Sequence, residues 1–119
     1  MSEEPCPCGT GRPLSDCCGP LLTTERLAET AEELMRSRYT AHVHGNVEHL
    51  WRTWDGRTRP ADVTPGDTRW TGLEVREVVD GGRDDSTGVV DFVASHDEGE
   101  LAGRSEFTRR GGRWFYTKG

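Results

Sequence analysis

The chain has 119 residues, which is enough for one domain or for one domain with a small appendage. Because 32% of the residues are hydrophobic and 30% are charged, we expect one modest core that a structural metal would help to stabilise. The net charge of -6 at pH 7 argues against a protein that coats nucleic acid through a basic face.

The first stretch, MSEEPCP, is polar and lacks the charged and apolar regions of a signal peptide. No apolar run approaches the length of a membrane span. We therefore expect a soluble, cytoplasmic protein with no membrane span. Thiols are normally reduced in that compartment, which favours metal binding or redox chemistry over structural disulfides.

All four cysteines lie in the stretch CPCGTGRPLSDCC, residues 6–18. Four thiolates suit a closed tetrahedral site, and such soft ligands select zinc or iron. A disulfide between neighbouring cysteines would close a small, strained ring. Two longer disulfides and a redox pair are the alternatives. The spacing favours a metal site whose ligands are Cys6, Cys8, Cys17 and Cys18.

The residues between the two cysteine pairs also favour a metal. Gly9 and Gly11 allow a short loop to aim backbone N–H groups at sulfur. Pro7 and Pro13 restrict the unbound loop and lower the entropy cost of ordering it. Arg12 supplies positive charge beside four thiolates whose combined charge exceeds that of a zinc ion.

The longer stretch CPCGTGRPLSDCCGP is similar to the SEC-C motif, a short zinc-binding element of the preprotein translocase ATPase and of several small bacterial proteins. The order Cys-x-Cys, Gly-x-Gly and Cys-Cys-Gly carries the resemblance. The resemblance implies zinc as the cofactor, with iron as the alternative. It also implies docking to a protein partner, because the translocase element contacts the SecB chaperone and the ribosome.

Two helices are predicted after a short linker. Thr23 or Thr24 can cap the first helix, and Gly45 ends it. Its buried face is predicted from apolar spacing to comprise Leu27, Ala31, Leu34, Met35 and Arg38. Asn46 caps the second helix. The apolar face of this second helix is predicted to comprise Val47, Leu50, Trp51 and Trp54.

Strands are predicted in the second half of the chain. Residues 57–68 contain prolines and a glycine and are predicted to form a loop, with one helical turn after Pro60. Alternating apolar residues predict strands over 69–79, 88–96, 104–110 and 113–119. Gly111 and Gly112 indicate a hairpin between the last two strands. Helices followed by antiparallel strands predict an α+β fold with the helices on one face of the sheet.

Two stretches carry a second resemblance: TAEELMRSRYTAHVHGNVEHLWRTW, residues 30–54, and RSEFTRRGGRWFYTKG, residues 104–119. Together they resemble the YchJ-like family of bacterial proteins. The resemblance implies a nuclear-transport-factor-two-like cone, in which a curved antiparallel sheet is wrapped by helices. With the cysteine motif in front, the expected division is a metal-binding knuckle over residues 1–22 and a cone domain over residues 23–119.

Cones of this kind often enclose a pocket between the sheet and the helices, although fold alone does not establish function. The residues predicted to line such a pocket are aromatic or charged: Tyr39, Trp54, Asp55, Arg59, Arg104, Glu106 and Trp114. The favoured interpretation is that the aromatic residues form the core and the arginines pair with acids. No catalytic residue is predicted, because Ser37 and Ser105 lack a paired histidine and acid pattern.

His42, His44 and His49 lie near the helix junction and are expected to be solvated or to cap a helix rather than to bind a second metal. Trp51 and Trp54 stand among arginines, which is typical of single-strand nucleic-acid binding. Because both tryptophans fall on the predicted buried face, we expect no direct nucleic-acid partner. The exception would be ribosomal RNA contacted by the basic tail, residues 104–119.

The leading hypothesis from the sequence is a noncatalytic interaction protein. Its zinc-bound knuckle would dock onto a protein partner in translation or secretion, and a chaperone and the ribosome are the candidates implied by resemblance. The alternative is a small-molecule-binding or hydrolytic domain that uses a pocket between sheet and helices. A homodimer formed through the face of the cone is a further prediction.

Overall fold

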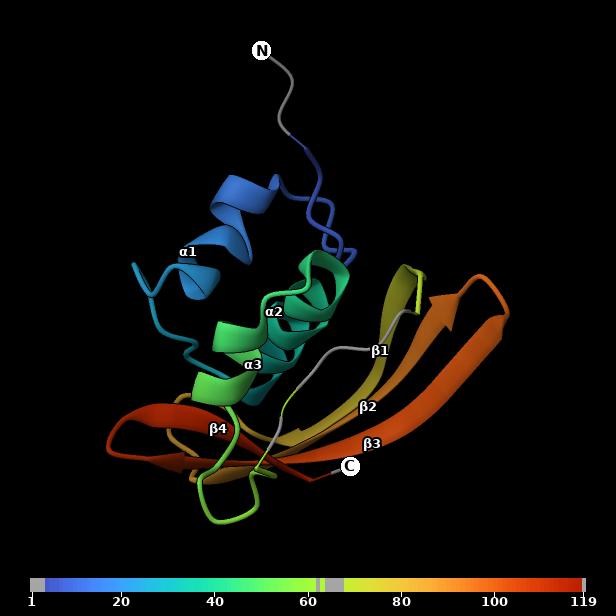
Figure 1. Ribbon diagram of the computed structural model, residues 1–119. Coiled ribbons are helices and arrows are strands. Elements are labelled where there is room, and N and C mark those ends of the chain that lie inside the picture. Colours follow the sequence, from blue (N-terminus) through green and yellow to red (C-terminus); the bar gives the residue numbers. More distant parts are fainter. Residues whose placement is uncertain (1–3, 62, 64–67, 119) are drawn as a thin grey trace.

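Among the residues that the structure describes, 4–61, 63 and 68–118, four strands form one antiparallel sheet (Figure 1). The structure is a computed structural model. The strands lie side by side in chain order: β1 Trp70–Asp80, β2 Thr87–His96, β3 Gly99–Arg110 and β4 Arg113–Lys118. Short turns join successive strands, so every pair in the sheet is antiparallel.

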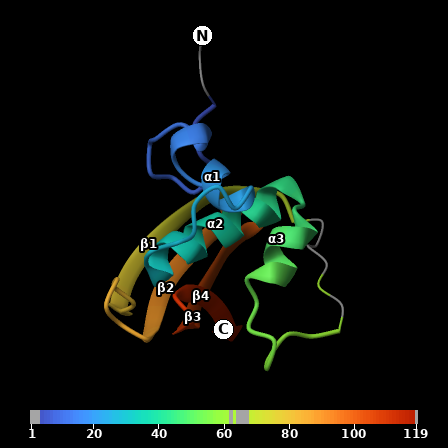
Figure 2. The ribbon, with the colours of Figure 1, turned by 90° about the vertical axis from the view of Figure 1, so that its left-hand side faces the viewer.

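Helices lie on one face of this sheet, which curves around them (Figures 1 and 2). In chain order the elements are a 3-10 turn η1 Leu14–Asp16, α1 Gly19–Leu22, α2 Ala31–His44 and α3 Val47–Arg52. The main core forms where α2 packs on the sheet, and its buried members are Ala31, Leu34, Met35, Val90, Phe107 and Trp114. The predicted α+β class with a curved antiparallel sheet is confirmed.

The start of the long helix differs from the prediction. Neither Thr23 nor Thr24 caps it, and Thr24 has a left-handed φ of 62°. The cap is Thr30, whose hydroxyl accepts a hydrogen bond from the backbone N–H of Glu33 at 3.1 Å. The other end is as predicted, because Gly45 closes the helix with a φ of 69°. As predicted, the side chain of Asn46 caps α3.

The predicted apolar face of the second helix is wrong in part. Leu50 is buried, but Val47 and Trp51 are 42% and 40% exposed. Helix α3 ends at Arg52, so Trp54 lies beyond it. The guanidinium carbon of Arg59 lies 3.9 Å from the ring centroid of Trp51, which leaves this ring partly covered on the surface.

Strand β3 begins at Gly99 rather than at residue 104 as predicted. The early residues have weak strand propensity, but they pair with β2, where Ala94 lies opposite Leu101. The hairpin at Gly111 and Gly112 is confirmed, and both glycines have positive φ. The helical turn predicted after Pro60 falls partly outside the described residues.

The turn between β1 and β2 meets the first turn of α2 at a close backbone contact. Ala31 N–H donates to the carbonyl of Gly81 at 2.9 Å. A Cβ atom on Gly88 would lie 2.5 Å from the Cα of Gly81 and 3.1 Å from the Cβ of Ala31. This spot therefore excludes any side chain at position 88 unless the backbone moves.

We expect Gly88→Ala to lower the free energy of unfolding by about 2–3 kcal/mol, because overpacking against backbone cannot be relieved by a rotamer change. Urea denaturation measures the difference. Gly72→Ala is the matched control, since a Cβ at Gly72 in β1 meets no atom within 4 Å. Equal stabilities of the two variants would contradict this account of the contact.

Candidate metal centre

The four cysteine side chains meet at one point in the N-terminal knuckle, which comprises residues 4–20. Their Sγ atoms all lie within 4.8 Å of one another, and those of Cys8 and Cys17 are 3.5 Å apart. A tetrahedral zinc ion with Zn–S bonds of about 2.3 Å would hold sulfurs about 3.8 Å apart. All four thiols are buried and unbonded to each other, so the arrangement fits a four-thiolate metal site.

A short antiparallel ribbon and a helical turn bring the two cysteine pairs together. Pro5 and Pro13 form an isolated bridge, and Cys6 N–H donates to the carbonyl of Arg12 at 2.9 Å. The turn of the ribbon depends on Gly9 and Gly11, each with a φ of 85°. The 3-10 turn η1 directly precedes Cys17 and Cys18 and places this second cysteine pair beside the first.

Polar groups surround the sulfurs. The hydroxyl of Thr10 lies 3.2 Å from Cys17 Sγ, and that of Thr40 lies 3.7 Å from Cys6 Sγ. Arg12 Nη2 lies 3.8 Å from Cys17 Sγ, and Arg36 Nη1 donates to the carbonyl of Cys8 at 2.8 Å. These donors offset the negative charge that four thiolates would bring to a buried site.

The thiols do not have equal acidity. The hydrogen bond from Cys18 is the main cause that lowers the pKa of Cys8 to about 4. The same bond, followed by burial, raises the pKa of Cys18, and burial raises the pKa of Cys17. Cys8 is therefore more acidic than Cys17 and Cys18, and a bound cation would favour ionisation of the latter two as well.

The knuckle is packed onto the sheet and α2 instead of standing apart from them. The cysteines form one buried cluster with Tyr39 and Ala94, against which Trp70 and Leu73 also pack. A Cβ atom on Gly9 would lie 3.1 Å from the carbonyl oxygen of Leu73. Figure 2 shows the knuckle above α2 and above the edge of the sheet that β1 forms. The cysteine cluster and the cone thus share one buried cluster of side chains.

Comparison with known proteins agrees with both parts of this arrangement. A family model for the SEC-C motif matches residues 4–20, and one for the middle NTF2-like domain of YchJ matches residues 30–119. A UPF0225 protein of Streptomyces coelicolor is 48% identical over 121 residues, covering 100% of this chain and 97% of the relative. The chain belongs to the YchJ-like family of UPF0225 proteins. The domain boundary expected at residue 22 stays a prediction.

Other UPF0225 members and two solved structures extend the comparison. A UPF0225 protein of Chromobacterium violaceum is 43% identical, covering 100% of this chain and 94% of the relative. The solution structure of a SEC-C motif containing protein from Rhodopseudomonas palustris matches with a TM-score of 0.80 and 31% identity, covering 97% and 96% of the two chains. A crystal structure of a SEC-C motif containing protein from Psychrobacter arcticus matches with a TM-score of 0.81 at 24% identity, covering 97% and 81%.

A cavity of about 320 Å³ lies between α2 and the sheet of this UPF0225 chain. Of the residues predicted to line a pocket, Tyr39 and Trp54 line it. Arg104 pairs with Asp91 at 2.8 Å, and Glu106 pairs with Lys118. Since the neighbouring Ser105 is buried toward the cavity, strand alternation puts Arg104 and Glu106 on the opposite face of the sheet.

The remaining predicted pocket residues lie elsewhere. Trp114 is buried in the main core, and Arg59 covers Trp51. Asp55 is 1% exposed and accepts hydrogen bonds from the backbone N–H of Arg57 and from the guanidinium of Arg110, at 2.9 and 2.6 Å.

The backbone N–H of Arg57 is the main cause that lowers the pKa of Asp55, and the charge of Arg110 adds to it. Asp55 N–H also donates to the carbonyl of Tyr116 at 2.7 Å. The carboxylate of Asp55 therefore ties the loop after α3 to the last hairpin and is not free to act on a ligand.

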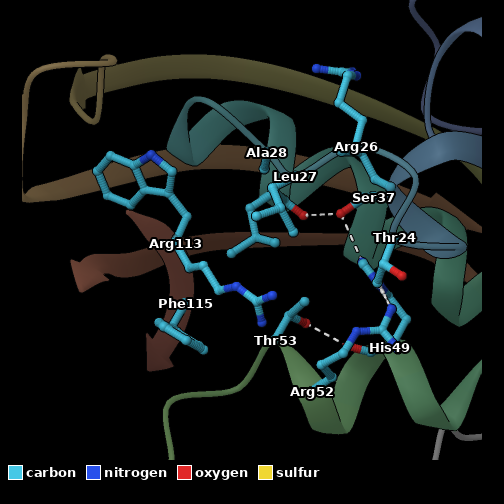
Figure 3. Close-up of a pocket in the computed structure, with 13 residues that line it drawn as sticks. Thr24, Arg26, Leu27, Ala28, Ser37, His49, Arg52, Thr53, Arg113 and Phe115 are labelled. Carbon is cyan, nitrogen blue, oxygen red and sulfur yellow. Dashed lines mark hydrogen bonds between the residues drawn. The ribbon is translucent and has the colours of Figure 1, made fainter. Parts of the chain in front are cut away.

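A serine and a histidine that the sequence did not pair meet beside a second, smaller cavity of about 40 Å³ (Figure 3). Ser37 Oγ lies 3.0 Å from His49 Nε2 and donates to the carbonyl of Leu34 at 2.8 Å. Arg52 Nη2 lies 3.0 Å from His49 Nδ1. Because arginine only donates, Nδ1 accepts and Nε2 carries the proton toward Ser37.

This tautomer cannot remove a proton from Ser37, so the pair has the wrong polarity for a nucleophile and its base. The cavity has room for about one or two water molecules, too little for an organic substrate. The arrangement supports the prediction that Ser37 is not catalytic. It also places His49 in the interior, contrary to the expectation that this histidine is solvated.

Within the described residues, the cysteines are the only set of three or more His, Cys, Asp or Glu side chains whose ligand atoms come together. The expectation that His42, His44 and His49 do not form a second metal site stays a prediction. No helix in the described part of the chain is long and apolar enough to cross a membrane.

Acid is expected to weaken the fold through His49. Burial, followed by the charges of Arg52 and Arg38, lowers the pKa of His49 from its ordinary value of 6.5 to about 4. The unfolded chain thus takes up the proton first as the pH falls. The stabilisation is fully present above pH 6.5 and is lost between about pH 6.5 and 4, at a cost on the order of 3 kcal/mol.

Urea denaturation at pH 7, 5.5 and 4 measures this effect. His49→Gln should lose less stability than the native chain between pH 7 and 4, because glutamine does not titrate. His44→Gln is the control, since His44 is exposed. Parallel pH profiles for the native chain and His49→Gln would show that His49 does not cause the acid sensitivity.

Proposed function

We propose that Cys6, Cys8, Cys17 and Cys18 hold a structural zinc ion, with iron as the alternative. The observation that carries the proposal is the meeting of four buried Sγ atoms within 4.8 Å. Four protein thiolates leave no coordination position for water or substrate, so the ion would support structure and not catalysis. The match to the SEC-C motif supports the same assignment.

Metal analysis of freshly purified protein tests this proposal. The expected result is about one zinc ion per chain in the native protein and none in a Cys17→Ser, Cys18→Ser double variant. Iron in place of zinc would select the alternative. Equal metal content in the two proteins would overturn the proposal, because the ion would then be bound elsewhere.

We propose further that the metal-bound knuckle is a docking element for a protein partner in translation or secretion, such as a chaperone or the ribosome. The cysteines are buried, but the loop residues between them are exposed: Gly9, Gly11, Arg12, Ser15 and Asp16. These exposed residues form a small polar surface whose shape would depend on the ion. A noncatalytic role is supported by the closed ligand set and by the wrong polarity of the Ser37–His49 pair.

Binding of purified SecB and of purified ribosomes to the zinc-loaded chain tests the docking role. One of the two should bind, and binding should fall at least about tenfold after chelation or in an Asp16→Lys, Ser15→Arg variant. Arg76→Ala, a change on the exposed surface of β1, is the control. No binding to either partner, or binding that chelation leaves unchanged, would contradict the docking role.

The second candidate function is the binding of a small molecule in the cavity between α2 and the sheet. The volume of about 320 Å³ lies at the lower end of the range for ligand pockets. A hydrolytic role has less support, because no aspartate or glutamate occurs among the described residues that line this cavity.

A further inference from the structure

The cavity between α2 and the sheet is mostly apolar but contains a buried cation. Its described lining residues come from α2, the segment after α3 and all four strands. The aromatic ones are Tyr39, Trp54, Trp70, Phe92, Phe107 and Tyr116. Aromatic rings therefore make up much of the wall, and Arg38 provides the positive charge.

Arg38 is 7% exposed and has no carboxylate within 4.0 Å among the described residues. Its Nη1 donates to the carbonyl of Leu50 at 3.0 Å and to the hydroxyl of Thr53 at 2.7 Å. Its Nε and Nη2 donate to no described residue. Burial lowers the pKa of Arg38 to about 10, which leaves the side chain charged at neutral pH.

The aromatic neighbours of Arg38 hold its guanidinium in place without neutralising it. The guanidinium carbon lies 4.4 Å from the ring centroid of Tyr116 and 5.3 Å from that of Trp54. Such cation–π contacts orient a guanidinium but leave its edge N–H groups available. A buried cation of this kind, with no acid to match it among described residues, is costly unless an anion accompanies it.

Trp54 provides a second, independent observation on the same wall. Its indole Nε1–H is buried and has no hydrogen-bond partner among the described residues. A buried donor without an acceptor is destabilising, and buried indole groups normally have a partner. Two elements therefore bring N–H groups that have no acceptor among the described residues to the wall of one cavity. They are Nε and Nη2 of Arg38, from α2, and Nε1 of Trp54, from the segment that follows α3.

We propose that this cavity binds a small aromatic carboxylate. The carboxylate would accept hydrogen bonds from the guanidinium of Arg38 and from the indole N–H of Trp54. The ring would lie against the apolar wall that Trp70 and Phe92 provide. Carboxylate and guanidinium match in charge and in planar shape, and the aromatic wall favours a flat, apolar body.

This inference does not depend on what the knuckle docks to. The cavity and the cysteine cluster do share Tyr39 and Trp70, so the zinc-loaded full chain is the protein to test. Failure of metal binding would be seen in metal analysis, whereas failure of the cavity proposal would be seen only in ligand binding to the loaded protein.

Calorimetric titration with two probes of equal shape tests the proposal: 2-naphthoate, which is anionic, and 2-naphthalenemethanol, which is neutral. Naphthoate should bind at least about tenfold more tightly, as expected for a charge-assisted hydrogen bond in a desolvated site. The indole N–H signal of Trp54, assigned from a Trp54→Phe variant, should shift with naphthoate. The corresponding signal of Trp51 should not, because Trp51 does not line the cavity.

Variants identify the donors. Arg38→Met should remove the preference for naphthoate over the alcohol, and Trp54→Phe should weaken naphthoate binding about three- to tenfold, more than it weakens binding of the alcohol. Arg59→Met is the matched control, since Arg59 stacks on Trp51 outside the cavity. If Arg38→Met fails to fold, Trp54→Phe and the two-probe comparison decide. Equal binding of both probes, or no binding of naphthoate at millimolar concentration, would overturn the proposal.

Discussion

Cys17→Ser is expected to lower the free energy of unfolding by about 3–5 kcal/mol, and the melting temperature by roughly 10–20 °C, through loss of the bound metal. Serine is close to cysteine in size, and Thr10 Oγ1, which lies 3.2 Å from Cys17 Sγ, can hydrogen-bond to it. Packing at position 17 should therefore change little, and the loss can be assigned to the metal. Thermal unfolding of both proteins, with metal analysis of each sample, measures the effect.

Chelation provides the check on this prediction. A strong zinc chelator should lower the melting temperature of the native chain and leave that of Cys17→Ser unchanged. Ser15→Ala, an exposed change in the same loop, should behave like the native chain. If neither chelation nor Cys17→Ser altered the melting temperature, the sulfurs would not hold a stabilising ion.

The sequence predicted the elements whose signals are local. The four cysteines lie within residues 6–18, so their meeting needs only a short loop, and its glycines indicate where the loop turns. Gly45 and Asn46 mark a helix end and a helix start by their own chemistry. Local signals also predicted the strands, which alternate apolar and polar residues, and the Gly111–Gly112 hairpin.

The features that the sequence did not predict depend on contacts between distant segments. Three threonines offer a cap for the long helix, and the Ala31–Gly81 hydrogen bond favours a start at residue 31, whose cap is Thr30. The early start of β3 depends on pairing with β2. The sequence did not show which alternate residues of β3 face the cavity. For this reason the prediction that Arg104 and Glu106 line the cavity was wrong.

The environment of Arg38 could be predicted from the sequence only in part. It falls on the predicted buried face of the long helix, where an arginine is unusual, and that position alone pointed to a charged group in the interior. That no acid in the described part of the chain lies beside Arg38, however, is a property of the fold. The same applies to the Ser37–His49 pair, since the two residues belong to different helices.

The shared core predicts that the knuckle and the cone stabilise each other. Tyr39 is 6% exposed, belongs to the cysteine cluster and packs edge-on against Trp70 with ring centroids 6.2 Å apart. Tyr39→Ala should therefore lower the free energy of unfolding by about 3–5 kcal/mol and speed release of zinc to a chelator. Leu34→Ala is the matched control, because Leu34 is equally buried but packs in the other cluster.

A double-mutant cycle separates coupling from simple destabilisation. In the Cys17→Ser background the knuckle no longer supports Tyr39, so Tyr39→Ala should cost at least about 1 kcal/mol less than in the native chain. Leu34→Ala should cost the same in both backgrounds within about 0.5 kcal/mol. If the double variant proves too unstable to measure, the rates of zinc release from Tyr39→Ala and Leu34→Ala give the same comparison. Additive effects at both positions, or equal release rates, would mean that the knuckle is an independent unit attached to the cone.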